Sequence, residues 1–517
     1  MNIFKKYLFI LLTYFIFGTS LFWAHFINQA VGLPDFRYTN ALTISISEQY
    51  YKTPSFVGLS PIYQFLVEND LLANVHHQKN AKNDISVLMN REYINAIIEK
   101  SKDISILQNE TYVKEAIERD YKRDVDTEPP SIIKIHQHED KGIITWFKIG
   151  LFLFDYDIYG IFYLYVIILI TSYLVYIMQF EDFKYPIYVA LIFSIIHFID
   201  VASLSNYSTE RGPIINVRFL SLLAFLPSLH VFFAILYNVK YDIKSCTLLL
   251  IQVVLLAFLF HVRSTVIIFY FIIFFCAFYQ FFISKNLGNN FFDYLKYYWV
   301  TSITVISLFS IIIVTPILQP KSFEKNTNYH LTWHNILIGF SVSPYFFNDP
   351  RYSFLKIGGD AIGFEAVKES DYSTASQKNG FYHHNYDHKG YEKVVKNIVF
   401  DMVKDNPYQF VILEIFYKPR ELLNQFLDYL NIAIFPLFKG SIGFFILSLF
   451  LFSFYCFRKV VFNYGVLVYS VLGFLLSAMP FLVAYPAPFL LTDLFTFFAM
   501  FFFLAIGLLI NRIFLIK

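Results

Sequence analysis

Long apolar runs are the feature that most limits how this chain can fold. A run of about 18 or more apolar residues is long enough to cross the hydrocarbon core of a bilayer as a helix. Such runs recur along the 517-residue sequence. They lie at 7–27, 158–178, 185–204, 217–237, 299–318, 431–457, 464–484 and 489–511. The pattern predicts an all-α polytopic membrane protein built as a helical bundle.

One further apolar stretch, 247–283, is too long for a single span at about 1.5 Å per residue. It is interrupted by His261, Val262 and Arg263. We interpret it as two spans joined at these residues, which gives about ten spans in all. With the N-terminus inside, every inside segment then carries Lys or Arg, as the positive-inside rule expects. A single span at 247–283 would instead place Arg458 and Lys459 outside.

The order of apolar and polar segments predicts the organisation of the chain. We expect a first transmembrane anchor, a first outer loop with amphipathic helices, a bundle of six spans, a second outer loop and three last spans. Their bounds are 1–27, 28–157, 158–318, 319–430 and 431–517. Helices are expected within the loops at Asn83–Lys100, Asn109–Tyr121 and Tyr391–Asp405, the last ending before Pro407.

The first span is interpreted as a retained anchor and not as a cleaved signal peptide. Its apolar stretch exceeds the roughly 7–15 residues of a signal-peptide core. Both large loops fall on the non-cytoplasmic side. The expected location is therefore a bacterial inner (plasma) membrane, with these loops on its periplasmic or extracellular face.

Net charge and cysteine content limit which partners and cross-links are expected. Apolar residues make up 56% of the chain and charged residues 15%, and the formal net charge is only +2. No nucleic-acid partner is indicated by so small a positive charge. The three cysteines, Cys246, Cys276 and Cys456, lie in or beside apolar runs, so no disulfide framework is expected.

Ionisable groups in and beside the spans gather toward the outer side. His197 and Asp200 lie near the outer end of one span, His261 and Arg263 lie at the turn, and Arg211 lies on the neighbouring outer loop. Such groups are costly to desolvate, so they usually face a cavity or each other. Two interpretations stay open: solvation at the headgroup level, or a polar cavity that opens to the outer leaflet.

A metal site is a weaker hypothesis. Asp155 and Asp157 lie at the outer mouth of the second span, where they are candidate ligands for a divalent cation such as Mg²⁺ or Mn²⁺ or are simply solvated. The stretch His383–His388 is dense in ligand types, but its spacing matches no zinc pattern, which favours a solvated loop.

The segment after the first span carries a family resemblance. It contains the run Leu33–Tyr38, with Asp35 a few residues beyond the span, and later Gly58–Pro61. This resembles the start of GT-C glycosyltransferases, polytopic enzymes that use polyprenyl-phosphate sugars. The family has a large first outer loop with an acidic residue near its beginning and a second large outer loop before the last spans. The run Thr332–Phe340, with Trp333 and His334, is similar to a pattern in uncharacterised bacterial membrane proteins related to that family.

The resemblance implies hexosyl or pentosyl transfer from a polyprenyl-phosphate donor to a cell-envelope glycan or lipid acceptor at the outer leaflet. Asp35 is the candidate catalytic base, or else a helix N-cap. Arg211, Arg263 and Lys418 are candidates for binding the lipid phosphate, or else snorkel to the interface. The complete set of expected substrate-binding residues is Tyr38, Arg211, His261, Arg263, His334 and Lys418.

Other functions stay open. An O-antigen-type glycan polymerase or ligase is also polytopic, but such proteins do not usually have a long loop directly after the first span. A transporter would place carboxylates or broken helices near the bilayer midplane, whereas the midpoints of these spans are apolar. A non-enzymatic membrane scaffold is the remaining alternative.

Overall fold

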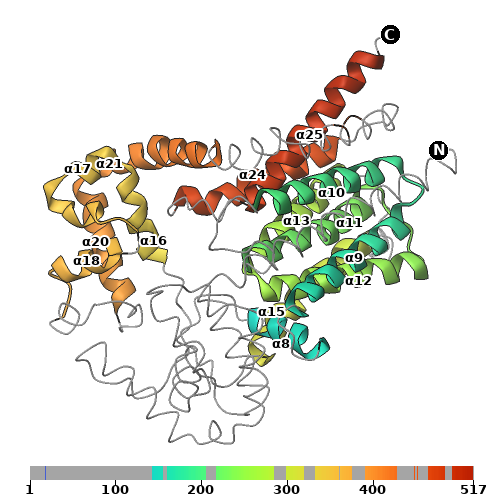
Figure 1. Cartoon of the computed structure of the whole chain (residues 1–517), viewed down its shortest axis with the longest axis horizontal. Coiled ribbons are helices and arrows are strands. Elements are labelled where there is room, and N and C mark those ends of the chain that lie inside the picture. Colours follow the sequence, from blue (N-terminus) through green and yellow to red (C-terminus); the bar gives the residue numbers. More distant parts are fainter. Residues whose placement is uncertain are drawn as a thin grey trace, which may run out of the picture.

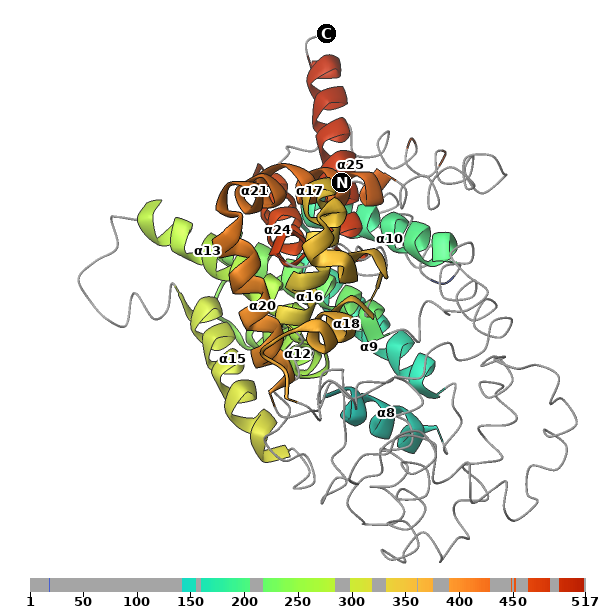
Figure 2. The same ribbon diagram turned by 90° about the vertical axis from the view of Figure 1, so that its left-hand side faces the viewer.

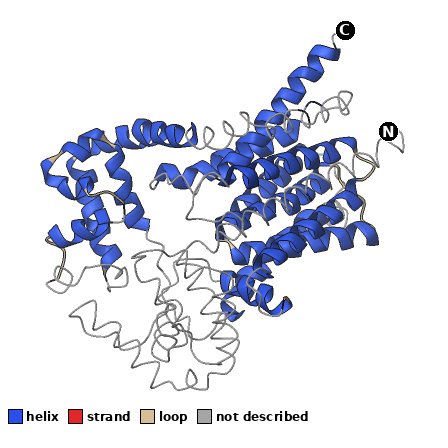
Figure 3. Ribbon diagram, viewed as in Figure 1, coloured by secondary structure: helices blue, strands red, loops and turns tan. Residues whose placement is uncertain are grey.

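The computed structural model describes most of the second half of the chain and part of the first. The described residues are 142–154, 160–204, 217–283, 298–318, 332–359, 361–374, 390–427, 464–483 and 492–515, with Gly18, Ser448 and Leu451. Helices and short connections make up this part, and no strand occurs among the described residues (Figure 3). The all-α prediction is confirmed for them.

A helical bundle forms the larger of two units and lies on the right in Figure 1. Helix α11 (Phe225–Leu236) lies at its centre, where α9, α12, α13 and α15 all pack against it. Residues Phe225–Ile235 of α11 are all buried, as expected for a helix that is apolar around most of its circumference. The surrounding elements are α8 (Gly142–Leu153), α9 (Gly160–Phe180), α10 (Lys184–Leu204), η2 (Val217–Ala224), α12 (Ile243–Val262), η3 (Ser264–Val266), α13 (Ile267–Ile283), α15 (Trp299–Leu318), α24 (Tyr464–Val483) and α25 (Thr492–Leu515).

The interruption predicted within 247–283 is confirmed. Helix α12 ends at Val262, Arg263 is extended with φ −141° and ψ 109°, and the short η3 leads into α13. Both α12 and α13 pack against the 12-residue α11. One straight helix could not place both of its halves beside so short a neighbour, so the chain turns back at Arg263.

The outward faces of the bundle are apolar. Two described helical stretches, Phe162–Phe180 and Ile243–Val262, are long and apolar enough to cross a membrane, and several described helices are apolar but shorter. Large apolar side chains such as Ile167, Phe275 and Ile313 are exposed on α9, α13 and α15. Extended exposed apolar surface marks contact with an apolar partner. The expected spans 7–27 and 431–457 lie almost wholly outside the described residues, so the number of spans stays a prediction.

A second helical unit, described over 332–427, has its own core and lies on the left in Figure 1. Figure 2 views it from its outer side, with the bundle behind it. Its elements are α16 (Thr332–Gly339), η4 (Phe340–Val342), α17 (Pro344–Asn348), η5 (Pro350–Lys356), α18 (Ala361–Glu369), α20 (Tyr391–Asp405), α21 (Pro407–Ile412) and the π-helical turn η6 (Leu413–Tyr417), after which helix continues to 427. The predicted helix Tyr391–Asp405 is confirmed, whereas those at Asn83–Lys100 and Asn109–Tyr121 lie outside the described residues.

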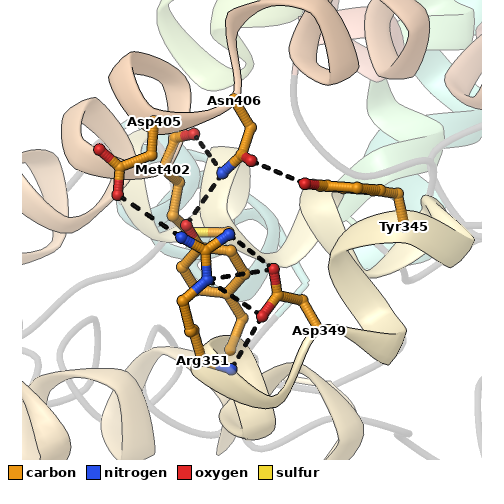
Figure 4. Close-up of polar contacts among 7 residues, drawn as sticks. Tyr345, Asp349, Arg351, Met402, Asp405 and Asn406 are labelled. Atoms are coloured by element: carbon orange, nitrogen blue, oxygen red, sulfur yellow. Dashed lines mark hydrogen bonds and ion pairs between the residues drawn. The ribbon is translucent and has the colours of Figure 1, made fainter.

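Polar contacts fix the break between α20 and α21 (Figure 4). The Asn406 amide accepts a hydrogen bond from the Tyr345 hydroxyl at 2.8 Å and donates one to the Tyr352 hydroxyl at 3.1 Å. Nearby, the Asp349 carboxylate caps η5 and pairs with the Arg351 guanidinium at 2.8 Å, which holds the pKa of Asp349 below its usual value. These contacts join α17 and η5 to the junction where Pro407 begins a new helix.

Candidate functional site in a buried polar cluster

Polar side chains from helices far apart in the sequence meet where α10 ends and α25 begins. The Tyr165 hydroxyl on α9 lies 2.8 Å from Nε2 of His197 on α10. One turn later on α10, the Asp200 carboxylate accepts a hydrogen bond of 2.9 Å from the Thr496 hydroxyl on α25. His197 and Asp200 are both buried. These contacts link α9, α10 and α25 through polar groups inside a largely apolar bundle.

A second carboxylate lies beside the first. Asp493 is three residues before Thr496 on α25, which places both on the same face of that helix. Its carboxylate accepts a 2.6 Å hydrogen bond from the Ser221 hydroxyl on η2. Asp493 also interacts electrostatically with Asp200 and with the Arg263 guanidinium at the α12–α13 turn. We call the connected set Tyr165, His197, Asp200, Ser221, Arg263, Asp493 and Thr496 the polar cluster.

Helix α8 packs on the chain just before Arg263. Nε2 of His261 lies 3.2 Å from the Thr145 hydroxyl on α8. At Gly142 the two backbones touch so closely that a Cβ would lie 2.1 Å from the carbonyl oxygen of His261. Only a residue without a side chain fits there, so this glycine sets the position of α8 relative to the turn that carries His261 and Arg263.

The structure brings together part of the predicted outer polar group. His197, Asp200 and Arg263 belong to the polar cluster, and His261 lies two residues from Arg263. The predicted residues Asp35, Tyr38, Arg211, Asp155 and Asp157 lie outside the described residues. Within the described ranges, no group of three or more His, Cys, Asp or Glu side chains is arranged to hold a metal ion.

His334 takes part in the packing of the second helical unit. Its ring is buried, and its Nδ1 lies 2.6 Å from the Tyr391 hydroxyl on α20. The backbone N–H groups of Trp333 and His334 donate to the Glu392 carboxylate at 2.9 and 3.2 Å. A carboxylate at the N-terminus of α16 is favoured by the helix dipole. These contacts tie α16 to α20, and a role for His334 in substrate binding stays a prediction.

Lys418 joins the second helical unit to the bundle. Its ammonium group donates to the Glu414 carboxylate at 2.5 Å and to the carbonyl oxygen of Val483, at the end of α24, at 2.9 Å. Burial lowers the pKa of Lys418, and the Glu414 carboxylate opposes this shift. A cation at the C-terminus of α24 also complements that helix dipole. His334 therefore lies within the second helical unit and Lys418 where that unit meets α24, whereas Arg263 lies in the bundle. The structure does not bring these three predicted substrate-binding residues into one group among the described contacts.

Sequence reasoning missed the carboxylate on the last helix. Asp493 is the only charged residue in the apolar stretch 489–511. An ionisable residue within such a stretch is by itself a sign of a functional site, so this signal was present in the sequence. The hydroxyls of Tyr165, Ser221 and Thr496 give no comparable signal, because such residues occur throughout the spans.

Comparisons of the chain with protein-family models, with curated proteins and with solved structures found no match. The chemistry open to the polar cluster follows from its own groups. A carboxylate such as Asp493 can accept a proton from a hydroxyl group. A guanidinium such as Arg263 can hold a phosphate through two parallel hydrogen bonds.

Proposed function

We propose that this protein is an integral membrane glycosyltransferase that resembles the GT-C enzymes. It moves a sugar from a polyprenyl-phosphate donor to a cell-envelope glycan or lipid acceptor on the outer leaflet. One observation carries the proposal: two carboxylates, the buried Asp200 and the half-buried Asp493, lie with the half-buried Arg263 in one polar cluster of a largely apolar helical bundle. Ionisable groups at such a position are costly and are generally functional.

The groups of the cluster match the needs of the reaction. The acceptor hydroxyl attacks the anomeric carbon from the face opposite the phosphate, its proton passes to the Asp493 carboxylate, and the bond from the anomeric carbon to the phosphate oxygen breaks. The configuration is inverted. Ser221 holds the Asp493 carboxylate, and Arg263 stabilises the negative charge that develops on the departing lipid phosphate. Asp35 is the alternative base, implied by the family resemblance alone.

The proposed setting is a bacterial inner membrane crossed by about ten spans, with 28–157 and 319–430 on the outer side. The exposed apolar side chains on the outward faces of α9, α13 and α15 support it, because they would meet lipid. The polar cluster also fits this topology. The end of α10, the end of α12 and the beginning of α25 all belong to the outer side.

Transfer by the purified protein in vesicles tests the proposal. We expect sugar to move from one of a panel of radiolabelled polyprenyl-phosphate sugars to a lipid acceptor. Arg263→Ala should lower the rate by roughly 100-fold because the leaving phosphate loses its cation. Arg351→Ala is the matched control, since Arg351 is an exposed arginine in the second helical unit.

Two outcomes would contradict the proposal: no transfer from any donor by folded protein, or equal rates for Arg263→Ala and wild type. Products extended by many repeating units instead of one sugar would favour the glycan polymerase.

The topology makes a separate prediction. After replacement of the native cysteines by serine, Lys356→Cys in η5 should react with an impermeant maleimide added outside intact cells. Lys240→Cys, between α11 and α12, should react only after the membrane is opened. Both side chains are exposed, so accessibility of the thiol is not limited by packing. Labelling of both positions from the same side would rule out the proposed topology.

A further inference from the structure

Helix α8 combines an apolar sequence with an exposed apolar end. Lys148 is the only charged residue of this helix. Trp146 is buried, whereas Phe152 is 66% exposed and Leu153 is 56% exposed. A helix with one side in water would carry polar and charged side chains on its exposed surface. What the exposed end of α8 meets depends on where this helix lies on the bundle.

Helices α9 and α12 run antiparallel, and two hydrogen bonds between them fix their alignment. The Ser172 hydroxyl on α9 donates to the Gln252 amide oxygen on α12 at 2.9 Å. Seven residues later on α9, the Gln179 amide donates at 3.3 Å to the hydroxyl of Ser245, which lies seven residues earlier on α12. The beginning of α9 therefore lies beside the end of α12, at the same end of the bundle.

Helix α8 crosses these two helices at a steep angle. Continued at the same spacing, the alignment places His261 on α12 level with Tyr163 on α9. A Cβ on Gly142 would lie 2.1 Å from the carbonyl oxygen of His261. A Cβ on Gly160 would lie 2.4 Å from the carbonyl oxygen of Gly150. These two contacts differ in level by about 4.5 Å, whereas the part of α8 between them is about 12 Å long. Helix α8 therefore runs nearly perpendicular to α9 and α12, at one end of the bundle (Figure 1).

The contact of α8 with α12 lies on an outward face of the bundle. The Trp146 ring stacks on the Phe258 ring of α12 with the ring centres 6.2 Å apart. Val254 and Leu250 lie four and eight residues before Phe258, which places all three on one face of α12. Both Val254 and Leu250 are exposed. Helix α8 thus packs on the same side of α12 as these exposed apolar side chains.

The contact with α9 repeats this pattern. Phe154, directly after α8, packs against Tyr163 with the ring centres 5.1 Å apart. Ile167 and Ile170 lie four and seven residues after Tyr163 on the same face of α9, and both are exposed. Among the described residues, the stretches long and apolar enough to cross a membrane belong to α9 and α12. The side on which α8 packs is therefore the side of these two helices that meets lipid in the proposed setting.

We infer that α8 lies in the plane of the membrane at its outer surface, on the lipid-facing side of α9 and α12. Its exposed Phe152 and Leu153 contact lipid hydrocarbon just below the headgroups. Tryptophan is enriched at this level of membrane proteins, and the long apolar stem of a lysine such as Lys148 also suits it. The end of the first outer loop is then embedded in the bilayer. The inference rests on the membrane location given in the proposed function, but not on glycosyl transfer.

Spin labels in vesicles of phosphatidylethanolamine and phosphatidylglycerol measure the depth of α8. After replacement of the native cysteines by serine, a nitroxide is attached to Phe152→Cys on α8. The matched controls are Val254→Cys on α12 and Lys356→Cys in the second helical unit, since all three side chains are exposed. Electron paramagnetic resonance gives the collision rates of each label with oxygen, which concentrates in hydrocarbon, and with a water-soluble nickel chelate. We expect the ratio of oxygen to nickel collisions at Phe152 to be several-fold above that at Lys356 and clearly below that at Val254.

The outcomes separate the two proposals. A ratio at Phe152 equal to that at Lys356, with Val254 in lipid, would overturn the inference and leave the membrane location standing. A ratio equal to that at Val254 would also overturn it, because α8 would then lie deep in the hydrocarbon. Low collision rates with both reagents at Phe152 would show that protein covers the end of α8 and would overturn the lipid contact. Frequent collisions with the nickel chelate at all three positions would overturn both proposals.

Discussion

Asp493→Asn is expected to lower the rate of glycosyl transfer by roughly two to four orders of magnitude, the usual contribution of a general base. The protein should still fold. Asparagine has the size of aspartate and keeps an oxygen that can accept the hydrogen bond from Ser221, now 2.6 Å long. It cannot take up the acceptor proton, and it brings no negative charge to face Arg263. Initial rates in vesicles, with the amount of folded protein measured in parallel, check the prediction.

Three companion variants sharpen this test. Ser221→Ala should have a smaller effect, because it removes only the group that positions the Asp493 carboxylate. Asp200→Asn keeps the bond to Thr496 and tests whether the second carboxylate is also needed. Asp35→Asn tests the base implied by the family resemblance. If Asp493→Asn kept full activity and Asp35→Asn lost it, the catalytic base would be Asp35 in the first outer loop and not Asp493.

Gly142→Ala is expected to displace α8 and to lower the thermal stability of the protein in detergent. The new Cβ would lie 2.1 Å from the carbonyl oxygen of His261 and 2.6 Å from the amide nitrogen of Val262. These are backbone atoms at the end of α12, so no side-chain rotation can relieve the clash. Overpacking of this kind costs about 1–3 kcal/mol or more. Transfer should also fall, since His261 and Arg263 lie at the displaced turn.

Gly18→Ala is the control for this variant, because no atom lies within 4 Å of the added Cβ. Its unfolding midpoint should be no lower than that of the wild type, since alanine favours the helix at this position; the change in tryptophan fluorescence on heating measures it. An unchanged midpoint for Gly142→Ala would mean that α8 does not pack on the end of α12 as described.

The positions of the apolar helices could be predicted from sequence because their signal is local. The expected span 185–204 corresponds to α10, Lys184–Leu204, and the expected span 299–318 to α15, Trp299–Leu318. A long apolar run and its charged ends lie within one short window of sequence, so no knowledge of the fold is needed. The break between α12 and α13 at Arg263 could be predicted for the same reason, because the polar residues that mark it lie next to one another in the sequence.

The pairing of polar groups could not be predicted in this way. Ser221 and Asp493 are 272 residues apart, and Asp200 and Thr496 are 296 apart. Which helix packs against which depends on side-chain fit over the whole bundle, and the sequence gives no local sign of it. The residue type of Lys418 was also not enough to predict its role. A lysine beside a membrane span suits a phosphate ligand, but the partners of Lys418 in the structure are Glu414 and Val483.

The contact between Phe426 and Phe498 has a mechanical consequence. Phe498 lies five residues after Asp493 on α25, and Phe426 lies near the end of the helix that begins in the second helical unit. This helix therefore connects the second helical unit directly to the helix that carries Asp493. A tilt of the second helical unit would therefore act on α25 through this contact, on the same helix as Asp493. The second helical unit is in this way connected to the helix of the polar cluster, although none of its own side chains belongs to that cluster.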